Sequence, residues 1–324
     1  MTVPLRKRIK RSMRSAIVRA AIRVLSLLPL SVALALGGAI GRLGYLLAGN
    51  TRRLALRHLA LAFPEKSEAE REAIARRMFV HLGRAALEVV TIRSYDARLE
   101  SYVELANGEV LREVMARGKG MMFVTGHVGN WELLARRIAR AGVPNAVIAK
   151  AGHDPRLNAL AEEFRASGGV TTLWRENAET GRAIIRTFRQ GRALGLLIDQ
   201  DTDVQGVHVP FFGRLAYTPR AAADLALRFG APVVVGTIRR KGPRAGDGHL
   251  LEVVEIPYDP SAADREAEAV RLTAACSLAL ETAIRRSPEE WVWMHERWKT
   301  RPPVEASAPR QASTMPKSSE LSGA

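Results

Sequence analysis

The chain has 324 residues, of which 47% are hydrophobic and 25% charged, so it can bury a full core as one domain with short appendages. Its single cysteine, Cys276, excludes an intrachain disulfide and is typical of a reducing compartment. The formal net charge of +16 at pH 7 indicates an anionic partner, either nucleic acid or the head groups of a membrane.

A basic arm and an uncharged segment open the chain. Residues 24–41 carry no charge, and eighteen residues lie at the lower limit for crossing a bilayer. Pro29, Gly37 and Gly38 weaken a straight helix there, and basic residues flank the segment on both sides, so the positive-inside rule gives no orientation. The segment is either a membrane span or a helix lying in the interface, and both predict membrane attachment. The positive charges of the arm are Arg6, Lys7, Arg8, Lys10, Arg11, Arg14, Arg19 and Arg23.

A basic stretch followed by an apolar one also fits a secretory signal. The basic region is long for a signal, however, and a helical pattern follows over residues 54–90 in place of a disulfide-stapled domain. We therefore expect residues 1–50 to form a basic arm and membrane anchor. An α/β domain is expected over residues 51–301. Residues 302–324 are rich in Pro, Ser and Ala without an apolar period, which predicts a disordered tail.

Residues 51–95 read as helical, with an interruption at Pro64. Ser67, followed by Glu68 and Glu70, is typical of a capped helix start. Apolar residues then recur every four positions from residue 74 to residue 90, which predicts one buried helix face.

Strands and helices alternate from residue 120 onward. Strands separated by crossover helices predict an α/β fold with a mostly parallel sheet sandwiched by helices, next to the N-terminal membrane-attached helical region. The expected strands are 121–125, 145–150, 170–174, 193–199, 232–239 and 250–256, and the expected helices are 131–142, 156–166, 178–190, 219–229 and 262–286.

The segment TGHVGNWE (125–132) links the first strong strand to the next helix. His127 thus stands at the carboxyl end of a strand, where open α/β sheets bind ligands, and Glu132 falls in the first turn of the helix. A plain loop histidine and a glutamate that complements the helix dipole would look the same. The strand end, the flanking glycines and the helix N-terminus favour a catalytic site.

These residue types suit the transfer of an acyl group to an alcohol. Histidine can remove the hydroxyl proton near neutral pH, and a carboxylate such as Glu132 can fix its tautomer and stabilise the imidazolium. Backbone N–H groups near Gly129 and Asn130 would stabilise the oxyanion. The sequence has no Gly-x-Ser-x-Gly elbow, and Cys276 lies in a helical stretch, so we expect no covalent intermediate.

HVGNWE matches the His-x4-Asp/Glu motif of the lysophospholipid acyltransferase superfamily. Within it the chain resembles the late acyltransferases of lipid A biosynthesis. The similarity includes LALRHLALAFPEKSEAEREAIARRMFVHLGRAALEVV, GHVGNWELL, LGLLIDQD, VPFFGRLAYTPRAAADLALRFGAPVV and PEEWVWMHERWKTRP. The resemblance implies an acyl-carrier-protein thioester as donor and a phosphorylated glucosamine disaccharide lipid as acceptor, used at the cytoplasmic face of the inner membrane.

The resemblance also implies roles for single residues. Arg165 or Arg175 would hold an acceptor phosphate, since arginine binds phosphate through two charge-assisted hydrogen bonds. Asp199 matches the acid at the end of its strand, where substrate would bind. Phe211 and Phe212, in PFFG, would line the acyl pocket, or form an ordinary buried turn.

Several alternatives remain open. The acceptor could be another glycolipid, such as a phosphatidylinositol mannoside, or a lysophospholipid, and the acyl length is not fixed. A basic nucleic-acid-binding protein is the competitor from another class, but no nucleic-acid-binding motif accompanies the charge. No metal or organic cofactor is expected. The acidic segment 199–206 could suggest a calcium site, but it lacks the glycine and glutamate of a calcium loop. Trp291, Trp293 and Trp298 fit either core packing or an interfacial belt.

Overall fold

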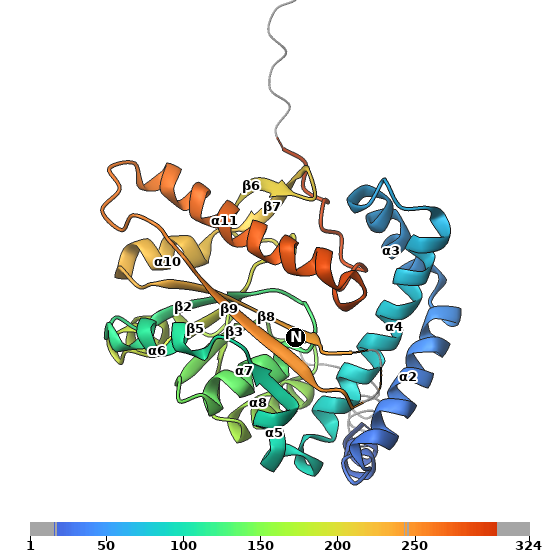
Figure 1. Cartoon of the computed structure of the whole chain (residues 1–324). Helices are drawn as coiled ribbons and strands as arrows, with labels where there is room; N and C mark the ends of the chain where they lie inside the picture. Colours follow the sequence, from blue (N-terminus) through green and yellow to red (C-terminus); the bar gives the residue numbers. More distant parts are fainter. Residues whose placement is uncertain (1–15, 17, 243, 245, 303–324) are drawn as a thin grey trace, which may run out of the picture.

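A seven-stranded sheet forms the centre of the protein in the computed structural model, which describes residues 16, 18–242, 244 and 246–302 (Figure 1). The strand order is β1-β9-β8-β2-β5-β3-β4, and only the pair β8–β9 is antiparallel. The predicted α/β fold with a mostly parallel sheet is confirmed. The strands are β1 (Val103–Leu105), β2 (Met121–Thr125), β3 (Asn145–Ala149), β4 (Val170–Trp174), β5 (Ala193–Leu197), β8 (Val233–Arg240) and β9 (His249–Ile256). A separate hairpin, β6 (Gly206–Phe211) and β7 (Arg214–Pro219), was not predicted.

Helices cover both faces of the sheet, which explains why every side chain of β2 is buried. One apolar core joins the sheet to α9 (Thr180–Arg189), α10 (Ala221–Phe229) and α11 (Arg265–Arg286). A second core, on the opposite face, joins it to α5 (Leu99–Tyr102), α6 (Gly108–Ala116) and α7 (Trp131–Arg140). The helix α8 (Pro155–Ser167) packs beside the edge strand β4.

Three helices stand beside the α/β domain: α2 (Leu30–Leu47), α3 (Gly49–Ala62) and α4 (Glu68–Val90) (Figure 1). The predicted start of α4 is confirmed. The hydroxyl of Ser67 accepts from the backbone N–H of Glu70, whose carboxylate accepts from the backbone N–H of Ser67. This capping box satisfies two N–H groups that the helix itself leaves unpaired.

The uncharged segment 24–41 is interrupted at Pro29, one of the three positions expected to weaken a straight helix. A helical segment at residues 18–25 ends in a turn, and α2 begins after Pro29 and continues past Arg42 to Leu47. Proline at this boundary has no N–H to donate to the preceding turn, so the break is expected. Among the described residues, α2 alone is long and apolar enough to cross a membrane, judged by length and composition.

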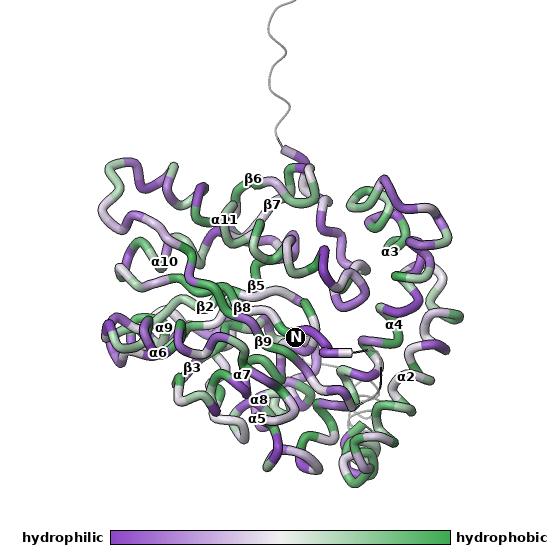
Figure 2. The backbone as a smooth tube through the Cα atoms, in the orientation of Figure 1, coloured by the Kyte–Doolittle hydropathy of each residue, from purple (hydrophilic) through white to green (hydrophobic). Residues whose placement is uncertain are grey.

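The helices α2 and α4 run antiparallel with their backbones in contact. A Cβ at Gly37 would lie 2.5 Å from the carbonyl oxygen of Gly83, and one at Gly41 would lie 2.2 Å from that of Phe79. The contact therefore requires glycine. The opposite face of α2 exposes large hydrophobic side chains. Hydrophobic residues make up much of this helix in Figure 2. The exposed large hydrophobic side chains of α2 are Val32, Leu36, Ile40, Leu43, Leu46 and Leu47.

An aromatic cluster fills the space between the hairpin, α4 and the segment after α11. Trp291 and Trp293 are buried in it and stand 4.5 Å apart between ring centroids. Trp298 packs against the same cluster. Core packing, the first of the two interpretations of these tryptophans, is therefore the correct one.

Candidate active site

The catalytic candidate His127 owes its position to two adjacent parallel strands. Thr125, the last residue of β2, pairs with Leu197, the last residue of β5. His127 and Asp199 each follow two residues later, so the two side chains emerge next to each other at the carboxyl edge of the sheet. Gly126 makes this approach possible, since a Cβ there would lie 2.9 Å from the Asp199 carboxylate.

The carboxylate of Asp199 contacts the His127 ring at Nδ1. Its Oδ1 lies 2.9 Å from Nδ1 of the ring, and its Oδ2 accepts from the backbone N–H of His127 at 2.6 Å and from the indole N–H of Trp291 at 2.7 Å. Burial opposes ionisation of Asp199, but the positive charge of His127 and these hydrogen bonds lower its pKa to about 2. An ionised carboxylate at Nδ1 keeps the proton there, so Nε2 is free to accept one.

Glu132 was predicted to orient His127, and the structure corrects this expectation. Its carboxylate forms a two-pronged ion pair with Arg165 of α8, at 2.9 Å to Nε and 2.6 Å to Nη2. Burial opposes the charge of Arg165, but Glu132 more than compensates and raises the pKa of the guanidinium. Two parallel hydrogen bonds fit a guanidinium better than an imidazole, which explains the choice of partner.

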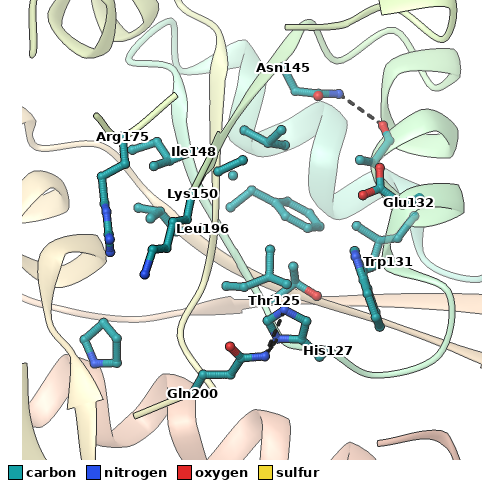
Figure 3. A pocket seen from close by; sticks show the side chains of 18 of the residues that line it. Thr125, His127, Trp131, Glu132, Asn145, Ile148, Lys150, Arg175, Leu196 and Gln200 are labelled. Atoms are coloured by element: carbon teal, nitrogen blue, oxygen red, sulfur yellow. Dashed lines mark hydrogen bonds between the residues drawn. The ribbon is translucent and has the colours of Figure 1, made fainter. Parts of the chain in front are cut away.

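A cavity of about 470 Å³ adjoins the pair and opens among the carboxyl ends of β2, β3 and β5 (Figure 3). His127, Trp131 and Glu132 stand on one side of it, and Lys150 and Arg175 extend from the other (Figure 3). Apolar side chains form much of its wall, and they include Phe123, Leu134, Ile138, Val147, Ile148 and Leu196.

The two arginines predicted to bind phosphate differ in this cavity. Arg165 is neutralised by Glu132. Arg175 has only a long contact to a carboxylate, 3.6 Å from Glu176, and Lys150 has no ion pair within the described chain. Arg175 and Lys150 therefore retain charge for an anionic ligand.

Gln200 and His295 complete the surroundings of the histidine, and the sequence analysis did not identify either as a contact. The amide nitrogen of Gln200 lies 3.0 Å from Nδ1 and 3.1 Å from Nε2 of His127. If this amide nitrogen lay in the plane of the His127 ring at these distances, it would overlap Cε1, the carbon between the two ring nitrogens. The amide nitrogen therefore lies over the face of the ring. The same nitrogen is 2.6 Å from Nε2 of His295. The in-plane lone pair of His127 Nε2 is thus left free.

The turn after His127 does not provide the predicted oxyanion site at Gly129. Its N–H donates to the carbonyl of Glu290 at 2.9 Å, and its own carbonyl lies 3.1 Å from Nε2 of His81. Asn130 is buried and its side chain caps α7, so only its backbone could serve. The Thr125 hydroxyl, in contrast, lines the cavity and is buried without a hydrogen-bond partner.

A buried ionic network fixes this turn to α4. Glu88, which is fully buried, accepts two hydrogen bonds from Arg240 at 2.8 and 2.9 Å and one from the Asn130 amide at 3.0 Å. His249 Nε2 lies 3.1 Å away, and the Tyr102 hydroxyl donates at 2.6 Å. Burial opposes ionisation, but these partners keep the pKa of Glu88 well below its usual value. No local sequence pattern predicts this network, because its members come from five separate segments of the chain.

Phe211 and Phe212 do not line the cavity. Both are buried in the aromatic cluster, with Phe212 stacked edge-on to Phe63 and Trp293. The buried turn, the alternative interpretation of PFFG, describes them correctly. The apolar wall of the cavity comes instead from the sheet and α7.

Glu290 gives the protein a pH-dependent stability that can be measured. Burial raises the pKa of its carboxyl from 4.5 to about 7. The folded protein therefore keeps a proton between these values that the unfolded chain has released, so this contribution to stability is complete below pH 4.5 and is lost as pH rises through 7. We expect the difference in unfolding free energy between wild type and Glu290→Gln to fall by about 3 kcal/mol from pH 4.5 to pH 8.

Urea denaturation at several pH values measures this difference. Burial lowers the pKa of the neighbouring His81 to about 3, which gives the opposite pH dependence below 6.5. Because His81 is present in both proteins, the difference isolates Glu290. A difference that stays constant from pH 4.5 to 8 would show that Glu290 is not protonated in the folded state.

Fold and site together define a class of protein: an α/β transferase with a histidine–carboxylate pair beside a largely apolar cavity that also holds free cations. Comparison with known proteins makes this specific. Residues 6–300 match the family model described as bacterial lipid A biosynthesis acyltransferase, and the chain belongs to this family. It is therefore an O-acyltransferase, and the resemblance drawn from its motifs is confirmed.

Relatives with known activities agree. The chain is 28% identical to the lipid A biosynthesis lauroyltransferase of Escherichia coli over 278 residues, covering 85% of this chain and 88% of the relative. It is 27% identical to the palmitoleoyltransferase of the same organism over 289 residues, covering 86% and 89%. A phosphatidylinositol mannoside acyltransferase of Mycolicibacterium smegmatis is 23% identical over 203 residues, covering 62% and 64%.

Proposed function

We propose that this enzyme transfers a fatty acyl chain from an acyl-carrier-protein thioester to a hydroxyl of a lipid A precursor, at the cytoplasmic face of the inner membrane. The observation that carries the proposal is the His127–Asp199 pair beside a cavity that combines apolar walls with Arg175 and Lys150. Apolar walls suit an acyl chain, and the two cations suit a phosphorylated acceptor. The lipid A enzymes among the relatives support the same acceptor.

In the proposed reaction, Nε2 of His127 removes the proton of the acceptor hydroxyl while its oxygen attacks the thioester carbonyl. Asp199 stabilises the imidazolium that forms. The tetrahedral intermediate then expels the thiolate, which receives the proton from His127, so the ester and the free thiol are the products. The Thr125 hydroxyl is placed to donate to a substrate oxygen in the cavity.

Glu132 and Arg165 have a different part in this proposal. Their ion pair connects the first turn of α7 to α8 and forms one wall of the cavity. The pair would shape the acceptor site and leave the proton transfer to His127 and Asp199. Arg175, which is less neutralised, is the better of the two predicted phosphate ligands.

Mass spectrometry of the reaction products tests the proposal. Detergent-solubilised enzyme is incubated with a tetra-acylated lipid A precursor and mixed acyl-carrier-protein thioesters, with His127→Ala as the control. We expect the precursor to gain the mass of one acyl chain only with the wild type. If the donor is consumed but the precursor is not acylated, the acceptor is another lipid. A phosphatidylinositol mannoside and a lysophospholipid are the next acceptors to test.

A further inference from the structure

A second cavity, of about 750 Å³, lies where the helical segment before α2, the end of α4 and α8 meet. We call it the arginine cavity, because Arg19, Arg23 and Arg93 line it. None of the three has a hydrogen bond or ion pair from its side chain to any described residue. Much of the remaining wall is apolar, and it includes Ile22, Val89, Val90, Ile92, Leu160 and Phe164.

The acids around this cavity leave it with positive charge. Asp96 is held by Arg136 at 2.9 Å and by Arg140 at 2.9 Å, so its charge is compensated. Glu163, on α8, is the one acid in the described lining without an ion pair. Three free guanidinium groups against one free carboxylate favour an anionic ligand.

The arginine cavity adjoins the catalytic cavity. Glu132 lines both of them, and its ion pair with Arg165 stands between the two spaces. One molecule with a polar head group could therefore occupy the arginine cavity while another part of it reaches His127. A volume of this size is sufficient for a head group of that kind.

The surroundings also indicate where this site stands. Val24 is 65% exposed and Leu27 is 83% exposed, next to the segment that carries Arg19 and Arg23. Bare apolar side chains beside cations are typical of a helix at a membrane interface. A ligand that enters here would thus be amphiphilic, with its anionic group at the level of the arginines.

We propose that the arginine cavity binds a phosphate group of the acceptor lipid, and so holds the acceptor while its hydroxyl lies at His127. This inference rests on the proposed function and adds a phosphate position separate from Arg175.

The test compares Arg23→Gln/Arg93→Gln with a matched control, Arg186→Gln/Arg189→Gln on α9, which removes the same charge at positions that line neither cavity. Kinetics are measured in neutral detergent with the phosphorylated acceptor and with the same lipid after enzymatic removal of its phosphate. All four arginines are exposed, so we expect both variants to fold, and circular dichroism checks this.

We expect the cavity variant to raise the acceptor KM by about tenfold or more, because charge-assisted bonds to phosphate are lost. Its kcat and donor KM should stay near the wild-type values, and the dephosphorylated acceptor should show no such difference. The control should behave as the wild type.

Other results would overturn the inference. An equal loss in the control would indicate bulk charge, and a raised donor KM would indicate docking of the acidic carrier protein. An unchanged acceptor KM, together with inhibition by phosphatidylglycerol that only the cavity variant escapes, would assign the site to bilayer phospholipid. If the wild type acylates no lipid A precursor, the proposed function fails. Equilibrium binding of the phosphorylated lipid then tests this inference separately. Equal affinity of the wild type and the cavity variant for that lipid would overturn it.

Discussion

Replacing His127 by alanine is expected to lower kcat by about 10³-fold, because the acceptor hydroxyl loses its proposed general base. The fold should survive, since the buried Asp199 carboxylate keeps its bonds from the backbone N–H of residue 127 and from Trp291. Initial rates at saturating donor and acceptor measure the loss, and thermal unfolding confirms the fold. Activity within tenfold of the wild type would exclude His127 as the base.

Asp199→Asn should lower kcat by about 10²- to 10⁴-fold, because an amide no longer holds the proton on Nδ1 or stabilises the imidazolium. Glu132→Gln serves as the matched comparison, since it replaces the carboxylate that bonds Arg165. We expect that variant to act mainly on the acceptor KM. A larger loss of kcat in Glu132→Gln than in Asp199→Asn would reverse the two assignments.

Glu88→Ala has the largest expected effect on stability. Removing Glu88 leaves the buried guanidinium of Arg240 without its partner, which costs about 3–5 kcal/mol in comparable sites. It also removes one of the two hydrogen bonds that the Asn130 amide nitrogen donates at the start of α7, so activity should fall along with stability. Urea unfolding in detergent measures the change.

The same helix offers a control for this prediction. Glu72 lies on the surface of α4, where it pairs with Arg76 at 3.2 Å and accepts from the Tyr45 hydroxyl at 2.8 Å, and Glu72→Ala should cost clearly less stability than Glu88→Ala. Glu88→Leu combined with Arg240→Met should recover part of the loss seen in Glu88→Leu, because no unpaired charge remains. If Glu88→Ala costs no more than Glu72→Ala, the network does not hold the turn.

Local sequence patterns were sufficient for most of the fold. Each predicted strand from residue 121 to residue 256 is present, because short apolar runs bounded by helices leave few alternatives. The start of α4 at Ser67 follows from a capping pattern within four residues. The hairpin β6–β7 was not predicted, because its strands contain polar residues and Pro210 and so lack a clear strand pattern. The two strands pair with each other, which satisfies their backbone hydrogen-bonding groups.

The candidate site depends on strand order, which local patterns do not determine. His127 was found from its strand end, but its partner Asp199 comes from β5, and only the adjacency of β2 and β5 brings the two together. Glu132 is nearer to His127 in sequence, but it lies in the first turn of α7, where its carboxylate pairs with Arg165. Sequence proximity therefore pointed to Glu132, whereas the strand order places Asp199 against His127.

The backbone contact between α2 and α4 has a consequence for selectivity. With no space for even a methyl group at Gly37 and Gly41, α2 packs directly against the backbone of α4. The helix α4 in turn carries Glu88 and His81, which hold the turn after His127. A bilayer bound to the bare face of α2 would thus be linked rigidly to the base. The histidine would stand at a constant height above the lipid surface, and the enzyme could choose among several hydroxyls of one acceptor by their distance from the membrane.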